Sequence, residues 1–272
     1  MPDNSPVPDL DPTPKIDTRV PHSARIWNYW LGGKDFYPVD QAAGDEYVKT
    51  FPGIVDIARQ SRAFLARAVR YLAGEAQVRQ FLDVGTGLPT VDNTHEVAQR
   101  VAPDARIVYV DNDPLVLVHA QALLASTPEG ACHYIDADLR EPEKILAAAA
   151  ATLDFGQPVA LMLMEILGHI TRDEQACSIV GRLMDGLPSG SYLVIADGTS
   201  EITAEFEQAQ QDYDETGAVS YKLRGSGQIA RFFAGLEILE PGIVPCLQWR
   251  PEVSPLSPPA GVQPLAGVGR KP

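Results

Sequence analysis

Two glycines and an acidic residue mark the part of the chain that is best suited to binding a ligand. An apolar run at positions 81–90, FLDVGTGLPT, contains Asp83 and then Gly85 and Gly87, with Thr86 between the glycines. Glycine lets the backbone turn sharply and lie directly against a ligand, where a side chain would intrude. The spacing therefore predicts a pocket for a nucleotide-type ligand at the end of a strand.

Two more apolar segments along the chain also end in acidic residues. In an open parallel sheet, ligands bind beyond the carboxyl ends of the strands. Asp111, followed by Asn112, is placed to accept hydrogen bonds from both hydroxyls of a ribose. Asp138 is placed to accept one from the exocyclic amine of adenine, and the backbone amide of Leu139 is placed to donate one to a ring nitrogen.

The loop itself restricts the kind of ligand. Thr90 stands where the dinucleotide motif G-x-G-x-x-G has its third glycine, which disfavours the packing of a pyrophosphate. Asp83 would also repel a phosphate, yet its carboxylate can help to hold the ammonium of an amino-acid group. S-adenosylmethionine has a ribose, an adenine, a sulfonium and an amino-acid group but no phosphate, so it is the predicted cofactor. A nicotinamide cofactor is the alternative.

A scaffold of alternating strands and helices must position these residues, and the hydrophobic periodicity from residue 80 onward predicts one. This alternation is typical of a parallel sheet with right-handed helical crossovers. The last two strands are too close together for a crossover, so we expect an antiparallel hairpin. The expected strands are 80–84, 106–110, 132–136, 159–164, 192–196, 236–239 and 243–249, and the expected helices are 93–101, 114–125, 142–152, 172–187, a segment from about 201, and 228–234.

A helical cap is expected ahead of the sheet. Aromatic residues, Tyr29 among them, crowd around Gly33, and their rings would either form a lid that attracts a sulfonium or simply pack the cap onto the sheet. Arg25 or Lys34 is the candidate partner of the cofactor's carboxylate. A row of arginines that includes Arg62 is interpreted as a solvated helix face. The expected cap helices are 24–31, 41–50 and 54–73.

Composition excludes several classes of protein. The formal net charge is −14 over 272 residues, which argues against binding nucleic acid through its phosphates. No apolar run reaches the ~18 residues needed to cross a bilayer, and no signal peptide is evident. Three widely spaced cysteines indicate neither a disulfide framework nor a zinc site, so no metal is expected. We expect a cytoplasmic protein that binds a small-molecule acceptor, for which a homodimer is allowed.

The chain is expected to have four parts. A Pro- and Asp-rich arm at 1–19 is predicted to be disordered, and the Pro- and Gly-rich end at 251–272 is predicted to be a similar tail. Between them lie the helical cap, 20–75, and the cofactor-binding domain, 76–250. The 45% hydrophobic content is sufficient for a buried core in such a domain.

In combination, the motifs resemble those of class I S-adenosylmethionine-dependent methyltransferases. They are more closely similar to a bacterial S-adenosyl methyltransferase family with the signature DVGTGLPT…NTHEVAQ, formerly a domain of unknown function. Over roughly residues 20–250, the resemblance implies a Rossmann-like α/β fold: a seven-stranded, mostly parallel sheet with an antiparallel last strand, plus the N-terminal cap. The matching segments are ARIWNYWLGGKDFYPVD (24–40), FLDVGTGLPTVDNTHEVAQ (81–99), VYVDNDPLVLVHAQALL (108–124), DADLREP (136–142) and LMLMEILGHI (161–170).

The sequence departs from the usual class I pattern around the loop and after the fourth strand. Pro89 occupies the third glycine position of acid-x-G-x-G-x-G, which makes the loop stiffer. The Asn/Asp-Pro-Pro-aromatic tetrad of many amino-group methylases is missing, so a nucleobase or a glutamine amide is not the expected acceptor. Small-molecule methylases often have a histidine pair here, whereas this chain has Gly168 and then His169.

The expected reaction is methyl transfer to an oxygen or nitrogen of a small molecule. The protein must mainly position two reactants and exclude water, and a base is needed only if the nucleophile loses a proton. His169 is the first candidate base and Glu165 the second, and Glu165 is also a candidate for lining the cofactor's pocket. Two alternatives remain open: a cofactor-binding module without turnover, and an NAD-dependent oxidoreductase.

Overall fold

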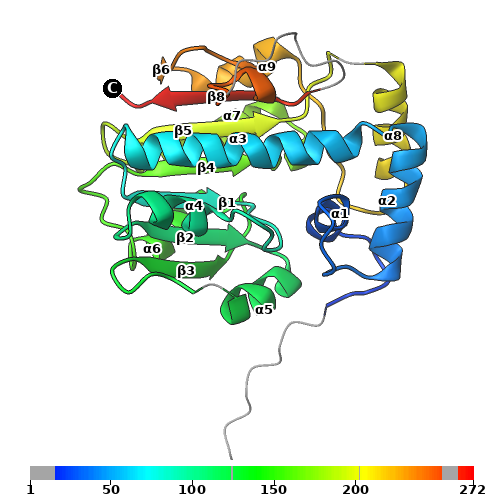
Figure 1. Ribbon diagram of the computed structural model, residues 1–272. Helices are drawn as coiled ribbons and strands as arrows, with labels where there is room; N and C mark the ends of the chain where they lie inside the picture. The colour runs from blue at the N-terminus through cyan, green and yellow to red at the C-terminus, as the bar shows by residue number, and fades with distance from the viewer. Residues whose placement is uncertain (1–15, 124, 202, 253–262) are drawn as a thin grey trace, which may run out of the picture.

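A central sheet with helices on both faces organises the chain (Figure 1). The computed structural model describes residues 16–123, 125–201, 203–252 and 263–272. The strands are β1 (Gln80–Val84), β2 (Arg106–Asp111), β3 (Ala131–Asp136), β4 (Ala160–Met164), β5 (Tyr192–Asp197), β6 (Glu237–Ile238), β7 (Val244–Pro245) and β8 (Leu265–Arg270). Their order is β3-β2-β1-β4-β5-β8-β6, with β1 to β5 parallel and β8 antiparallel to its neighbours. The predicted mostly parallel, Rossmann-like sheet is confirmed.

Helices fill the connections between the strands and build the cap. Prolines open α2, α5 and α6, where a missing N–H costs nothing. Asn93 precedes α4, and its backbone N–H donates to the Glu96 carboxylate at 2.8 Å, which fixes the helix start. The helices are α1 (Ser23–Trp30), α2 (Pro38–Thr50), α3 (Ile54–Gly74), α4 (Thr94–Val101), α5 (Pro114–Leu123), α6 (Pro142–Ala149), α7 (Asp173–Asp185), α8 (Ala204–Asp214) and α9 (Ser226–Ala230), with short 3₁₀ helices η1 (Leu167–His169), η2 (Arg231–Phe233) and η3 (Cys246–Gln248).

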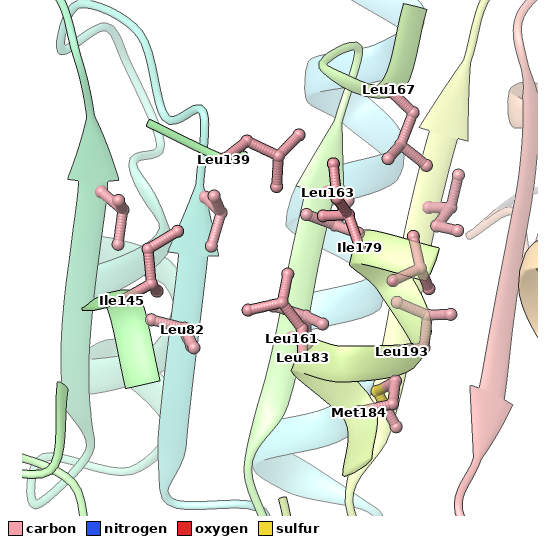
Figure 2. Close-up of a cluster of buried hydrophobic side chains, with 14 of the residues drawn as sticks. Leu82, Leu139, Ile145, Leu161, Leu163, Leu167, Ile179, Leu183, Met184 and Leu193 are labelled. Atoms are coloured by element: carbon pink, nitrogen blue, oxygen red, sulfur yellow. The ribbon is translucent and has the colours of Figure 1, made fainter. Parts of the chain in front are cut away.

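The two faces of the sheet form separate hydrophobic cores. On one face, α3 and α4 pack their apolar sides against the strands, with Phe64 and Phe81 fully buried. On the other face, side chains of the strands meet those of α6 and α7 (Figure 2). Each fully buried Leu, Ile or Phe contributes about 1.5–3 kcal/mol to folding. Figure 2 labels members of this second core, among them Leu82, Leu161, Leu193, Ile145 and Leu183.

The cap lies at the carboxyl ends of the parallel strands, where Figure 1 shows α1, α2 and α8 gathered together. It was predicted to be N-terminal only, but α8, which follows β5, is part of it. Although α8 is acidic on its solvent side, Phe206 and Tyr213 are buried against Tyr47 of α2. Two distant parts of the chain therefore close one end of the sheet.

The end of the chain differs from the prediction. The predicted hairpin over 236–249 does not form, because β6 and β7 both pair with β8 and so make one interrupted edge strand. The predicted tail at 251–272 contains β8, an interior strand, so the sheet domain extends past residue 250. A Cβ atom at Gly269 would lie 2.9 Å from Phe233, so tight packing requires the glycines that made this segment resemble coil.

The start of the chain is described only from residue 16 onward. Most of the predicted disordered arm, 1–15, lies outside the described residues, and so do 253–262 of the predicted tail. Asp17 is described, and its carbonyl oxygen accepts a hydrogen bond from Arg25 Nη1 at 3.1 Å. Within the ranges described above, no helix is both long enough and apolar enough to cross a bilayer.

Candidate active site

A cavity lies where the cap meets the carboxyl ends of the parallel strands, and residues from both parts line it. Parallel strands present their carboxyl ends at one edge of a sheet, so the acidic strand ends converge there as the topology predicts. The sequence-predicted residues that line this cavity are Asp83, Gly85, Thr86, Gly87, Asp111, Asn112, Asp138, Leu139, Glu165 and His169.

The turn after β1 leaves room for a ligand. Gly85 and Gly87 have φ angles of +75° and +66°, which residues other than glycine rarely adopt. A Cβ atom at Gly85 would overlap Ile166, whereas one at Gly87 would meet no described atom within 4 Å. Before the turn, Asp83 accepts a hydrogen bond from Thr94 Oγ1 at 2.6 Å, and burial raises its pKa to about 6. The open backbone at Gly87 is a place where a ligand can approach.

Asp111 at the end of β2 both holds this turn and faces the cavity. Its Oδ2 accepts the backbone N–H of Gly87 at 2.8 Å, and its Oδ1 accepts that of Asp113 at 3.0 Å. Burial raises the pKa of Asp111, and the two backbone donors oppose that rise. Because a carboxylate oxygen can accept more than one hydrogen bond, each oxygen retains capacity for a ribose hydroxyl.

The residues after β3 provide a polar group beside an apolar surface. Asp138 Oδ1 accepts the backbone N–H of Arg140 at 2.8 Å, and Asn112 Nδ2 lies 3.3 Å from Oδ2. Leu139, which follows, is buried and lines the cavity. A flat heterocycle with an exocyclic amine matches this combination.

The structure does not bring Arg25 or Lys34 to the cavity. Arg25 is buried and makes a paired contact with Asp113, with Nε and Nη2 each 3.1 Å from a carboxylate oxygen. Lys34 is exposed to solvent. Neither side chain is placed for the predicted role toward a cofactor carboxylate, because Arg25 already neutralises a buried acid and Lys34 points to solvent.

Tyr29 and Gly33 likewise serve the packing of the cap. The Tyr29 hydroxyl donates to Asp45 Oδ1 at 2.5 Å, and a Cβ atom at Gly33 would overlap the side chain of Asn28. Neither residue is among the described residues that line the cavity. Between the two predicted roles of this aromatic segment, packing accounts for Tyr29, whereas Trp27 and Trp30 do line the cavity.

Arg62 of α3 is a cation that lines the cavity beside the glycine turn. It was predicted to be solvated, but Nη2 donates to the carbonyl oxygens of Val91 at 3.2 Å and Asp92 at 3.3 Å. Its Nε is buried and has no hydrogen-bond partner in the part of the chain that the structure describes. Burial lowers the pKa of Arg62, and the charge of Asp83 opposes this. A half-buried guanidinium whose charge is not paired with an acid among the described residues suits the carboxylate of an amino-acid group.

Glu165, Asp197 and Tyr221 form a polar cluster at the ends of β4 and β5. The Tyr221 hydroxyl lies 3.1 Å from Glu165 Oε2 and also makes a short contact with Asp197 Oδ1. Burial, together with the charge of Asp197, raises the pKa of Glu165 to about 8. Glu165 has a φ of +52°, which is unusual for a residue with a side chain and often marks a functional position.

Sequence reasoning missed Asp197 and Tyr221 for different reasons. Asp197 closes the fifth parallel strand, so the rule that selected Asp111 could have found it. Tyr221 lies in an irregular segment without a periodic signal, and only tertiary contacts place it. The backbone N–H of Lys222 donates to Gly168 at 2.8 Å, and Arg224 donates from Nη1 to Leu167 at 2.9 Å, so this segment is fastened to η1.

His169 lines the cavity next to this cluster. Its Nδ1 lies 3.2 Å from the carbonyl oxygen of Ser220, and its ring meets that of Tyr221 edge-on at 5.1 Å. Because a carbonyl only accepts hydrogen bonds, Nδ1 carries the hydrogen and Nε2 has the free lone pair. Burial lowers the pKa of His169, so the ring is neutral at pH 7.

Aromatic rings from the cap surround the space in front of the cluster. We call this space the aromatic chamber; it is the part of the cavity bounded by these rings together with Glu165 and Tyr221. Apolar walls with a few polar groups are typical of small-molecule sites. The rings that line it are Trp27, Trp30, Tyr47, Phe206 and Tyr213.

Strand order, the glycine turn and the acidic strand ends together define a class I S-adenosylmethionine-dependent methyltransferase fold. A family model described as S-adenosyl methyltransferase matches residues 10–272. The chain therefore belongs to the S-adenosyl methyltransferase family, and S-adenosylmethionine is its cofactor. This membership decides against the nicotinamide alternative.

Solved structures agree with this assignment. A DUF574 family protein from Streptomyces avermitilis is 45% identical, with a TM-score of 0.90 over 95% of this chain and 100% of that one. A putative methyltransferase from Thermobifida fusca is 40% identical, with a TM-score of 0.87 over 96% of this chain and 99% of that one. Magnesium protoporphyrin IX methyltransferase from Synechocystis, solved with bound S-adenosylmethionine, shares the fold alone, at 12% identity and a TM-score of 0.52 over 91% and 90% of the chains. No curated protein matches the chain.

Proposed function

We propose that this chain transfers the methyl group of S-adenosylmethionine to a nitrogen or oxygen of a small-molecule acceptor. The observation that carries the proposal is the aromatic chamber, which adjoins the glycine turn within one cavity. A chamber walled by rings suits a compact organic molecule better than a polymer surface. The net charge of −14 further supports an acceptor other than nucleic acid.

The residues around the glycine turn fit the cofactor. Asp111 has acceptor capacity for the ribose hydroxyls, and Asp138 with the Leu139 amide matches the adenine edge. Arg62 lines the cavity, and its Nε has no hydrogen-bond partner among the described residues, so the guanidinium can bind the carboxylate. When bound, the cofactor supplies an electrophilic methyl group on its sulfonium.

The chamber's own residues would position the acceptor and receive its proton. His169 is neutral and has a free Nε2, whereas Glu165, whose pKa is raised to about 8, is a stronger base than an ordinary carboxylate once it is ionised. The cap helices exclude water from the reacting atoms. Either group satisfies the need for a base, and an acceptor that is already neutral and nucleophilic needs none.

The test is release of S-adenosylhomocysteine from the purified protein against a panel of small amines, alcohols and phenols. We expect acceptor-dependent release above the blank without acceptor. A matched measurement of S-adenosylhomocysteine affinity shows whether the cofactor half is intact. Tight binding of S-adenosylhomocysteine with no turnover across the panel would contradict the proposal and favour a binding module without turnover.

A further inference from the structure

Glu165 lines the aromatic chamber, and a second acid, Asp197, is buried beside it on the neighbouring strand. Met164 pairs with Ala196 in register, and the backbone N–H of Glu165 donates to Ala196 at 2.7 Å, so the next residues, Glu165 and Asp197, lie side by side. The hydroxyl of Tyr221 is shared between their carboxyl groups. Parallel pairing therefore places two acids side by side inside the protein. Burying even one ionised acid without a partner costs free energy.

The surrounding cations do not balance these acids. Arg224 Nη1 is 3.8 Å from Asp197 Oδ2, but its Nε also binds Asp173 at 3.1 Å. Lys222 binds the same Asp173 at 2.8 Å. Three acids thus share two cations, and Glu165 is the acid with no ion pair among the described residues. Its Oε1 is buried and makes no hydrogen bond of good geometry within that part of the chain, although Ser61 and the Gly198 backbone are close enough to oppose the rise of the Glu165 pKa.

The aromatic walls of the chamber independently favour an acceptor that is cationic and has an apolar body. Trp30 and Tyr47 pack edge-to-face at 5.2 Å, and Tyr47 continues to Tyr213 at 5.9 Å, so the rings form a continuous aromatic surface lining the cavity. Ring faces attract cations, and the ring bodies receive apolar groups. A negatively charged acceptor would meet both Glu165 and the electron-rich ring faces, which disfavours it.

We propose that the methyl acceptor is a primary or secondary amine on an aromatic or similarly apolar body, with its nitrogen held by Glu165. This inference rests on the proposed methyl-transfer function. It narrows the nucleophile from oxygen or nitrogen to an amine that binds as its ammonium. Tyr221 is a positioning residue here, since it orients the Glu165 carboxyl group through the hydrogen bond to Oε2.

Methyl transfer from S-adenosylmethionine to such an amine needs no further reactant. Glu165 takes one proton from the acceptor's ammonium, which frees the nitrogen lone pair. That lone pair forms the new C–N bond to the methyl carbon while the C–S bond breaks and its electron pair passes to sulfur. The products are the methylated ammonium and S-adenosylhomocysteine, and the proton on Glu165 returns to water. Burial raises the pKa of Glu165 to about 8, and the positive charge of the bound ammonium favours the ionised form that the step requires. An ionised carboxylate with a raised pKa is better matched to an amine than an ordinary carboxylate is.

The experiment compares matched probes that differ only in the reacting group. Calorimetry with the protein saturated with S-adenosylhomocysteine measures binding of 2-phenylethylamine, 2-phenylethanol and 3-phenylpropionate, and of tryptamine with its alcohol and acid counterparts. We expect at least one amine to bind about tenfold or more tightly than its alcohol, and the acids to bind worst. With S-adenosylmethionine, the same amine should release S-adenosylhomocysteine.

Glu165→Gln should remove the preference for the amine and leave the weak alcohol binding unchanged. Glu207→Gln, an equal change of charge on the exposed face of α8, should retain the preference. S-adenosylhomocysteine affinity measured on each variant reports whether it is folded. Equal or tighter binding of the alcohols, or an undiminished preference in Glu165→Gln, would overturn the amine assignment and leave methyl transfer standing. Failure to bind S-adenosylhomocysteine at all would instead overturn the proposed function.

Discussion

Gly168 and Tyr221 are packed directly against each other, so that a Cβ atom at residue 168 would overlap the Tyr221 ring. Position 168 is where many small-molecule methylases have the first histidine of a pair. In this chain a ring from a distant segment fills that space, and it brings a hydroxyl to Glu165 and Asp197. A side chain at 168 and Tyr221 cannot both be accommodated.

Gly168→Ala should therefore displace Tyr221 and lower the rate of methyl transfer by about 10–100-fold, because small displacements of positioning groups have effects of this size. Affinity for S-adenosylhomocysteine should remain unchanged. Gly181→Ala is the matched control, since a Cβ atom at that helical position meets no described atom within 4 Å. Equal rates for the two variants would mean that Tyr221 does not position a reacting group.

Arg62→Met should weaken binding of S-adenosylhomocysteine by about 10–100-fold, because a buried charge-assisted hydrogen bond is lost. Binding of 5′-methylthioadenosine, which lacks the amino-acid group, should not change. Arg59→Met, on the exposed side of the same helix, is the control and should alter neither affinity. Calorimetry measures the affinity of each variant for the two ligands. An equal loss for both ligands would show that Arg62 supports the loop rather than the carboxylate.

Asp111→Ala should weaken the binding of both ligands, whereas Arg62→Met should weaken only that of S-adenosylhomocysteine. Loss of the ribose partner should weaken S-adenosylhomocysteine and 5′-methylthioadenosine alike, by about 1–3 kcal/mol. Asp104→Ala, an exposed change shortly before β2, serves as the control. Because Asp111 also accepts the Gly87 N–H, circular dichroism and thermal unfolding should accompany the titrations. Unchanged affinity in a folded variant would reject the ribose assignment.

Stability should respond to pH through Glu165. Burial raises the pKa of Glu165 from an ordinary 4.5 to about 8. The protonated group therefore contributes to the free energy of unfolding at low pH, and this contribution is lost as the pH rises through 8. Glu165→Gln removes that loss and should raise the free energy of unfolding by about 1–3 kcal/mol at pH 8. At pH 5 the two proteins should be nearly equal. Urea unfolding at both pH values measures this, and a difference independent of pH would exclude ionisation as the cause.

Much of the sheet was predictable because each parallel strand is an apolar run with an acidic residue at its last position or next to it. Asp111 and Asp138 follow from that rule, since strand ends converge wherever a parallel sheet forms. β8 did not follow, because its glycines are explained by Phe233, Leu236 and Ile243, which pack on them from an earlier part of the chain. Local composition cannot reveal a partner that is distant in the sequence.

The cation that is available to bind the cofactor's carboxylate could not be predicted from the sequence for a similar reason. Arg25 and Arg62 are chemically identical, and the sequence favoured Arg25 for its aromatic neighbourhood. In the fold, Arg25 neutralises Asp113, while Arg62 lines the cavity and has no ion pair with another described residue. Which arginine is available depends on which buried acid each one meets, and that is a tertiary property.

The position of β8 between β5 and the interrupted edge strand affects how the chain folds during its synthesis. Leu265–Arg270 must leave the ribosome before the sheet can close, although β5 has emerged many residues earlier. Until then the nascent domain has an open strand edge, which is a site for chaperone binding or for aggregation. This enzyme can therefore complete its fold only after translation has passed residue 270.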